Sequence, residues 1–244
     1  MPVSTMMSMS SQQYSDFLEK NPPSNNAEGQ AQVRRVGRRI QGAVEEYMTS
    51  IGHREDMTDY DWQFNLVDDD QINAWALPGG RVVVYSGLLE VAQNDTGLAV
   101  VMGHEIAHAL ADHGNERVSQ MMLAQAGTLA LAIGLSNSDA ENPQLWMLAF
   151  GIGTQLGLML PYSRLHESEA DYLGLVFMSM AGYDPRESVA FWQRMSEAGE
   201  AKPPEIISTH PSDATRIRNL TERLPETIPL YEKALAEHEA ERDD

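Results

Sequence analysis

The sequence predicts an α+β protein that is mainly helical and contains one small three-stranded sheet. Apolar residues recur at helical spacing in most of the chain, whereas alternating apolar runs bounded by turn residues are found within residues 62–85. With 244 residues, of which 42% are hydrophobic, the chain can bury one sizeable core. We therefore expect one main domain, over residues 31–224, with an appendage at each end.

The N-terminal appendage and the first core helix differ in composition. Residues 1–30 are rich in Met, Ser, Gln, Asn and Pro and contain few large apolar side chains, so we expect a loosely packed leader. Residues 31–51 place apolar side chains at a helical period, and Gly52 follows them. This segment is predicted to form the first core helix.

Three strands and a short helix are expected next. Residues 62–67 alternate, residues 72–77 form a second extended segment, and residues 81–85 follow the strong turn signal Pro78-Gly79-Gly80. A short helix over residues 86–92 then leads into a longer apolar helix. The sheet would place an edge strand beside that longer helix, although a sheet that only caps the core has the same pattern.

Two apolar runs, residues 121–135 and 145–160, are separated by a polar link and predict a helical hairpin within residues 116–160. Each run is shorter than the roughly 20 residues that a membrane span needs. Because the first run is apolar nearly all round, it must be buried in protein or contact lipid or a hydrophobic partner. We favour burial over a peripheral membrane contact through residues 121–160.

The C-terminal third is predicted to be helical. Helices are expected over residues 163–181, 185–197 and 212–224, separated by glycine and proline. Pro225 and Pro229 should interrupt the last helix, so that residues 225–244 form a separate acidic helical tail.

Composition excludes several classes of function. The formal net charge is −19, and no basic face is large enough to bind a phosphate backbone, so we expect no nucleic acid partner. The chain has no cysteine, so any metal must be held by nitrogen and oxygen ligands. Residues 1–33 lack the pattern of a signal peptide.

The most informative stretch is His104-Glu105-Ile106-Ala107-His108, an H-E-x-x-H pattern inside an apolar, helix-forming run. Residues four apart lie on one face of a helix, about 6 Å from each other, so both imidazoles can bind one metal ion. Glu105 could then act as general base toward a water on that metal. Asn94 is a candidate N-cap for this helix.

A catalytic zinc site needs three protein ligands and one open position. Glu167 and Asp171 are four residues apart in the predicted helix over 163–181, so one can bind the metal while the other accepts a hydrogen bond from a ligand histidine. We assign Glu167 as the ligand and Asp171 as the acceptor from His104. The alternative is a pair of carboxylates that only face solvent.

Together these motifs resemble a known family. The stretches 104–108, 163–171, 181–185 and 208–211, in this order and spacing, are similar to the zinc metallopeptidase family of HtpX, the CAAX prenyl endopeptidase and the bacterial envelope protease BepA. The resemblance extends over about residues 32–224. It implies a gluzincin-type fold with one Zn²⁺ per chain, bound by His104, His108 and Glu167.

The resemblance also favours one branch of the family. The multi-span membrane architecture of HtpX and of the prenyl endopeptidase is absent from this sequence, which favours the soluble, BepA-like branch. That branch implies a location in the bacterial cell envelope or periplasm, where a lipid anchor on the full-length protein is an option.

His210, in Ser208-Thr209-His210-Pro211, matches a loop histidine of the envelope branch. The resemblance implies that it is either a fourth metal ligand that closes the site or a catalytic group that stabilises the oxyanion. A loop histidine without a catalytic role is the alternative. Arg216 and Arg218 follow it and could pair with the helix of Glu167, bind a substrate carboxylate or remain surface charges.

Residues 73–80 resemble the substrate-strand segment of the family. An edge strand offers N–H and C=O groups to which an extended polypeptide can add as a further strand. The residues expected to hold the substrate are Asn73, Ala74, Gly79, Gly80 and Val82.

The sequence therefore predicts a zinc-dependent endopeptidase that is open to autoinhibition by His210. Its substrates, extended chains of unfolded or misassembled proteins, are implied by the resemblance. The alternative is a latent zinc-site binding or assembly factor that engages client proteins through the apolar hairpin. The sequence indicates no oligomeric state.

Overall fold

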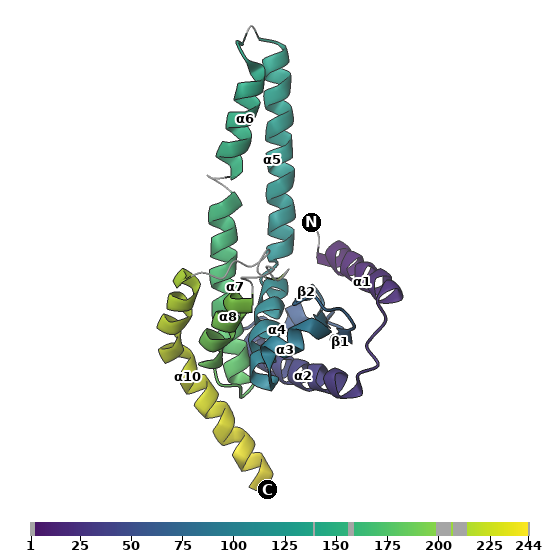
Figure 1. The fold of residues 1–244 in the computed structure, drawn as a ribbon, viewed down its shortest axis with the longest axis vertical. Helices are drawn as coiled ribbons and strands as arrows, with labels where there is room; N and C mark the ends of the chain where they lie inside the picture. Colours follow the sequence, from purple (N-terminus) through teal and green to yellow (C-terminus); the bar gives the residue numbers. More distant parts are fainter. Residues whose placement is uncertain (1–2, 139, 156–158, 199–205, 207–213, 244) are drawn as a thin grey trace. The chain divides into compact units, whose positions relative to one another are not determined.

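The computed structural model describes residues 3–138, 140–155, 159–198, 206 and 214–243 (Figure 1). The chain forms two compact units, which are described separately. Unit 1 comprises residues 1–111 and 168–244, and unit 2 comprises residues 112–167. The fold is mostly helical with one small sheet, which confirms the predicted fold class at that level.

The sheet in unit 1 has the strand order β1-β3-β2, with β1 at Gln63–Val67, β2 at Ala74–Leu77 and β3 at Arg81–Tyr85. The central strand β3 pairs in parallel with β1 and antiparallel with β2. Gly79 and Gly80 form the turn between β2 and β3 at φ of 90° and 82°, a region that favours glycine. The three predicted strands are therefore present.

Helix α4 carries the H-E-x-x-H stretch and lies among the other elements of unit 1. Apart from α1 and α7, described below, the helices of this unit are α2 (Ala27–Ser50), the short 3-10 helix η1 (Arg54–Met57), α3 (Ser86–Ala92), α4 (Asp95–Leu110), α8 (Glu187–Ala198) and α10 (Ala214–Asp243). Every residue of α4 from Gly97 to Ala107 is buried, because α2, α3, β2 and α8 all pack against it. Asn94 caps α4, and its side chain accepts hydrogen bonds from the backbone N–H groups of Thr96 and Gly97.

The N-terminal residues differ from the loosely packed leader that their composition predicts. Val3–Lys20 form helix α1, and Tyr14 is only 3% exposed. The Tyr14 hydroxyl accepts a hydrogen bond from Asn65, and the ring of Phe17 meets the ring of Trp75 edge to face at 4.9 Å. A few aromatic side chains, each burying a large apolar area, are enough to hold this helix on the sheet.

The C-terminal helix also differs from expectation, because α10 runs without interruption through Pro225 and Pro229. Each proline removes one backbone donor from the helix. The buried residues Leu220, Thr227 and Ala234 lie along the same helix, and this packing outweighs the missing hydrogen bonds.

Unit 2 contains helices α5 (His113–Ser136) and α6 (Pro143–Thr154), which run side by side in opposite directions, and the first residues of α7 (Leu160–Met180) (Figure 1). The prediction that this hairpin is buried is wrong for burial within this chain: Leu123 is 67% exposed and Trp146 57%. Two helices can bury only the faces that they turn toward each other. Among the described residues, α5 is the one helix long and apolar enough, by length and composition, to cross a membrane.

An ion pair connects α2 to the first turn of α4. Arg35 donates from Nε and Nη2 to the two carboxylate oxygens of Asp95, each at 2.7 Å. These hydrogen bonds hold the pKa of Asp95 below its usual value, against the opposing effect of partial burial. The Arg35 side chain is 55% exposed, so solvent screens much of the interaction.

Replacing Arg35 should destabilise unit 1 in a manner that depends on pH. We expect Arg35→Gln to lower the free energy of unfolding by about 0.5–1 kcal/mol near neutral pH. Because the folded-state pKa of Asp95 is lowered, the ion pair stabilises the folded state fully above the unfolded-state pKa of about 4. This stabilisation is lost as the pH falls through the folded-state pKa. Urea unfolding at several pH values measures it, with the exposed Arg34→Gln as control. A difference between Arg35→Gln and the parent that persists in acid would contradict this assignment.

Helices α4 and α7 approach each other backbone to backbone. A Cβ atom built on Gly174 would lie 3.0 Å from the backbone N of His104, and one on Gly103 would lie 3.0 Å from the carbonyl oxygen of Gly174. Such contacts are tighter than side chains normally allow, and the atoms they meet belong to the backbone. The two glycines therefore set the spacing of these helices.

A bulky residue at Gly174 should force α7 away from α4. We expect Gly174→Val to lower the free energy of unfolding by about 1–3 kcal/mol, as overpacked cores do. Gly42→Val is the matched control, since Gly42 is also helical but a Cβ atom added to it would meet nothing within 4 Å. Urea unfolding of both variants separates close packing from helix propensity, and equal stabilities would show that the glycine pair is not a packing constraint.

Candidate metal centre

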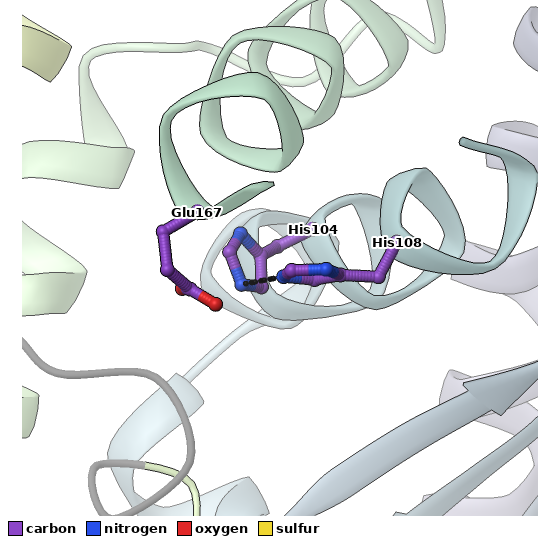
Figure 2. Close-up of side chains that lie close together, drawn as sticks. All are labelled: His104, His108 and Glu167. Carbon is purple, nitrogen blue, oxygen red and sulfur yellow. Dashed lines mark hydrogen bonds between the residues drawn. The ribbon is translucent and has the colours of Figure 1, made fainter. Parts of the chain in front are cut away.

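Two imidazoles from α4 point toward one position. His104 and His108 lie one helical turn apart, and their Nε2 atoms are 3.1 Å from each other (Figure 2). Their rings are nearly perpendicular, at 80°. His104 is only 2% exposed, so its environment is set by the protein rather than by solvent.

Glu167, on α7, completes a group of three candidate ligands. One ligand atom from each of His104, His108 and Glu167 lies within 4.8 Å of the others, and within the described part of the chain no other group of three such side chains does this (Figure 2). The donor set is two imidazole nitrogens and one carboxylate oxygen, as in catalytic zinc sites. Two nitrogens on a tetrahedral zinc lie roughly 3.3 Å apart, which the separation of the Nε2 atoms approaches. These residues therefore fit a zinc ion.

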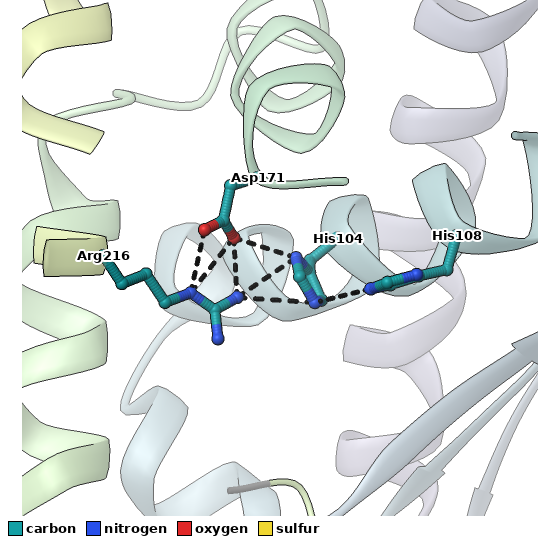
Figure 3. A network of polar contacts seen from close by, with 4 residues as sticks. All are labelled: His104, His108, Asp171 and Arg216. Atoms are coloured by element: carbon teal, nitrogen blue, oxygen red, sulfur yellow. Dashed lines mark hydrogen bonds and ion pairs between the residues drawn. The ribbon is translucent and has the colours of Figure 1, made fainter. Parts of the chain in front are cut away.

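Asp171 supports His104 from the side opposite to the candidate metal position. Its Oδ1 atom lies 3.0 Å from Nδ1 of His104 and its side chain is 10% exposed (Figure 3). An acceptor at Nδ1 favours the tautomer that carries its proton there and leaves Nε2 to bind a metal. This is the position that the sequence analysis expects for Asp171.

Arg216 is a second partner of Asp171. Of the roles that the sequence left open for Arg216, the structure shows the pairing with the helix of Glu167, since Asp171 lies on α7. Arg216 lies 45 residues further along the chain, on α10, and donates to both oxygens of the carboxylate. Burial alone would raise the pKa of Asp171, but the positive charge of Arg216 and the hydrogen bond from His104 outweigh it and hold the pKa below its usual value. Arg218, two residues further on, is exposed.

Glu105, the expected general base, is 5% exposed and follows His104 directly on α4. Its role in proton transfer stays a prediction. The remaining histidines of the described chain do not join the ligand group. His113 stacks on His166, which is 2.7 Å from Glu116, and His53 bonds the exposed Asp56.

His210 lies outside the described residues, as do Ser208, Thr209 and Pro211. Its two expected roles, fourth metal ligand and oxyanion-stabilising group, both stay predictions.

The residues expected to hold the substrate fall into three places. Ala74 begins β2, the strand that packs along α4, and Asn73 directly precedes it. The carbonyl oxygens of Gly79 and Gly80 accept hydrogen bonds from the chain around β1, at Asp61 and Gln63. Val82 is a correction: it is fully buried on the central strand β3, paired with β1 and β2, so its backbone cannot take up a further strand. The order of strands in a sheet does not follow from their order in the chain.

Comparison with known proteins identifies the family. The model of peptidase family M48 matches residues 35–224. Mitochondrial metalloendopeptidase OMA1 of Schizosaccharomyces pombe is 38% identical over 191 residues, which cover 75% of this chain and 52% of that protein. The beta-barrel assembly-enhancing protease of Escherichia coli is 29% identical over 194 residues, covering 76% of this chain and 40% of that protein.

These matches have two further consequences. The chain spans about half the length of the Schizosaccharomyces pombe relative and 40% of the length of the Escherichia coli relative. Relatives named as mitochondrial and a bacterial one both match, so restriction to the bacterial envelope branch is supported only in part. The family predicted from the motifs is confirmed: this chain belongs to peptidase family M48, a family of metallopeptidases.

Proposed function

We propose that this protein is a zinc-dependent endopeptidase that hydrolyses peptide bonds in extended segments of unfolded or misassembled proteins. The observation that carries the proposal is the convergence of His104, His108 and Glu167, which pairs the H-E-x-x-H helix with a glutamate from a second helix as in a gluzincin. Membership of family M48 supports the same chemistry.

The residues around the centre have distinct roles in this mechanism. A zinc ion held by the three ligands would activate a water molecule and polarise the scissile carbonyl group. Glu105 takes the proton from the attacking water and delivers it to the leaving amine. Asp171 keeps His104 oriented throughout.

The substrate is proposed to add to the outer edge of β2. The outer edge of β1 is already occupied, since Ser24 donates to the Leu66 carbonyl and Pro23 bridges to Val67. Within the described ranges, β2 pairs only with β3, and it packs along α4. An added strand is bound through its backbone N–H and C=O groups, so unfolded chains of varied sequence can bind in this way. Because this binding requires no chain terminus, cleavage can occur away from the chain ends.

Removing the proposed base should abolish cleavage without removing the metal. For the zinc-loaded Glu105→Gln variant we expect the rate of casein cleavage to fall by about 10²–10⁴, because a neutral amide cannot accept the proton. Zinc content, measured on the same sample, should equal that of the parent. The exposed Glu90→Gln is the matched control and should cleave normally.

The same assay addresses autoinhibition and the rival function. A His210→Ala variant that cleaves faster than the parent supports a site closed by His210; a slower one supports the oxyanion role. Loss of zinc from Glu105→Gln, or undiminished cleavage by it, would contradict the proposed base. A parent that binds zinc and unfolded protein but cleaves nothing would favour the assembly-factor alternative.

We further propose that unit 2 contacts a lipid bilayer. At 1.5 Å per residue the 24-residue helix α5 is about 36 Å long, which exceeds the hydrocarbon thickness of about 30 Å. The exposed large apolar side chains of the hairpin α5–α6 are Met121, Met122, Leu123, Leu129, Ile133, Leu145, Trp146, Leu148 and Ile152. With a net charge of −19, attraction to anionic lipids cannot drive the contact, so it must be hydrophobic.

Vesicles test this contact directly. We expect the parent to co-sediment with neutral phosphatidylcholine vesicles at low and high salt, and Leu123, Leu129 and Ile133 replaced together by serine to reduce the bound fraction several-fold. Ile51→Ser, which changes an exposed isoleucine of unit 1, is the control. A parent that stays in the supernatant would contradict the proposal and leave client proteins as the partner of the hairpin.

A further inference from the structure

We propose that Arg216 is a positioning residue of the metal centre, which clamps Asp171 so that Asp171 holds His104 with its Nε2 atom toward the other ligands. The inference rests on the proposed metal centre and assigns to it a residue that contributes no ligand atom. Three observations carry it, and Figure 3 shows the contacts of Arg216 with Asp171 and His104.

The first contact is a two-pronged ion pair. Arg216 donates from Nε to Oδ2 of Asp171 at 2.9 Å and from Nη2 to Oδ1 at 2.6 Å. Paired donors of this kind define the plane of the carboxylate as well as its position. Since Oδ1 is also the atom that faces Nδ1 of His104, at 3.0 Å, the clamp determines where that acceptor lies.

The second contact restrains the guanidinium itself. The central carbon of the Arg216 guanidinium lies 3.3 Å from the centre of the Trp192 ring, and Trp192, on α8, is 1% exposed. The Trp192 ring also meets the His104 ring, at 5.6 Å between centres. Arg216 is thereby enclosed between an aromatic face and a carboxylate, a geometry that a planar guanidinium can satisfy and an ammonium group cannot.

The third observation is burial. The Arg216 side chain is 5% exposed and the Asp171 side chain 10%. A buried carboxylate is costly unless a charge of opposite sign lies beside it, and arginine supplies a charge that is never lost at ordinary pH. With so little exposed surface, Arg216 is a poor candidate for binding a substrate carboxylate, one of the roles that the sequence left open. Its Nη2 atom also lies 3.2 Å from Nδ1 and 3.4 Å from Nε2 of His104, so Arg216 restrains the imidazole directly as well as through Asp171.

The affinity of the full chain for Zn²⁺, measured by competition with a chromophoric chelator, tests the clamp. We expect Arg216→Gln to bind zinc about 10–100-fold more weakly than the parent, the loss typical for supporting residues of metal sites. Arg216→Lys keeps the charge without the paired donors and should fall between the two. Arg218→Gln, an exposed arginine on the same helix, should bind zinc as the parent does.

A double-mutant cycle separates the clamp from a general loss of structure. If Arg216 acts through Asp171, then Arg216→Gln should weaken zinc binding little further in the Asp171→Asn background. Additive losses, or parental affinity in both Arg216 variants, would overturn the proposal. Should Arg216→Gln fail to fold by circular dichroism, the Lys variant decides alone.

The affinity measurement needs no cleavage. A parent that binds zinc but does not cut protein would therefore overturn the proposed peptidase function while the clamp is still judged by zinc affinity. A parent that binds no zinc would overturn both.

Discussion

The close approach of α4 and α7 is the constraint on which the rest of the site depends. One helix carries both histidines and the other carries Glu167 and Asp171, so the ligand group exists only if the two backbones lie near each other. Gly103 and Gly174 permit this, since a Cβ at either position would meet backbone atoms of the other helix at 3.0 Å. Gly103 directly precedes His104, so the point of closest packing and the metal centre are neighbours. The close packing at these glycines therefore brings the ligands into range.

The polar groups next to this contact then have to be satisfied in a place with little water. His104, Asp171 and Arg216 all contact one another, and the Trp192 ring covers the guanidinium of Arg216. An unpaired carboxylate would be costly here, and an unpaired arginine equally so. The arrangement meets both needs and, as a consequence, gives His104 an acceptor on the nitrogen that does not face the other ligands. The same pairing of these side chains thus serves both the stability of the fold and the orientation of His104 for metal binding.

The sequence predicts those parts of the site that depend on local geometry. His104, His108 and the pair Glu167 and Asp171 are recognisable because a spacing of four has one meaning in a helix, and the sheet is recognisable from its alternation and its glycine turn. Arg216 is different: the sequence offered pairing with the helix of Glu167 as one of three roles, but only the fold shows that its partner is Asp171. Val82 was misplaced for a related reason: its alternation shows a strand, but only tertiary pairing shows that the strand is central.

The wrong predictions at the two ends of the chain and in the hairpin have another origin. The composition of a segment does not show which few side chains in it pack against the rest of the protein. Tyr14 and Phe17 are a small part of a polar leader, yet they hold α1 on the sheet. Two prolines predict a break in α10, yet buried side chains on the same helix sustain it. For α5, the apolar surface predicts that the helix contacts an apolar partner, but it does not show whether that partner is protein or lipid.

The position of unit 2 in the chain gives that last ambiguity a functional meaning. Residues 112–167 stand in sequence between His108 and Glu167, so the chain leaves the first two candidate ligands, forms the hairpin and returns at the third. A zinc ion held by these three residues would therefore take ligands from both sides of the insertion in the sequence. If a bilayer or a client protein bound to the hairpin changes the affinity for zinc, linkage requires that zinc change the affinity for that partner by the same factor.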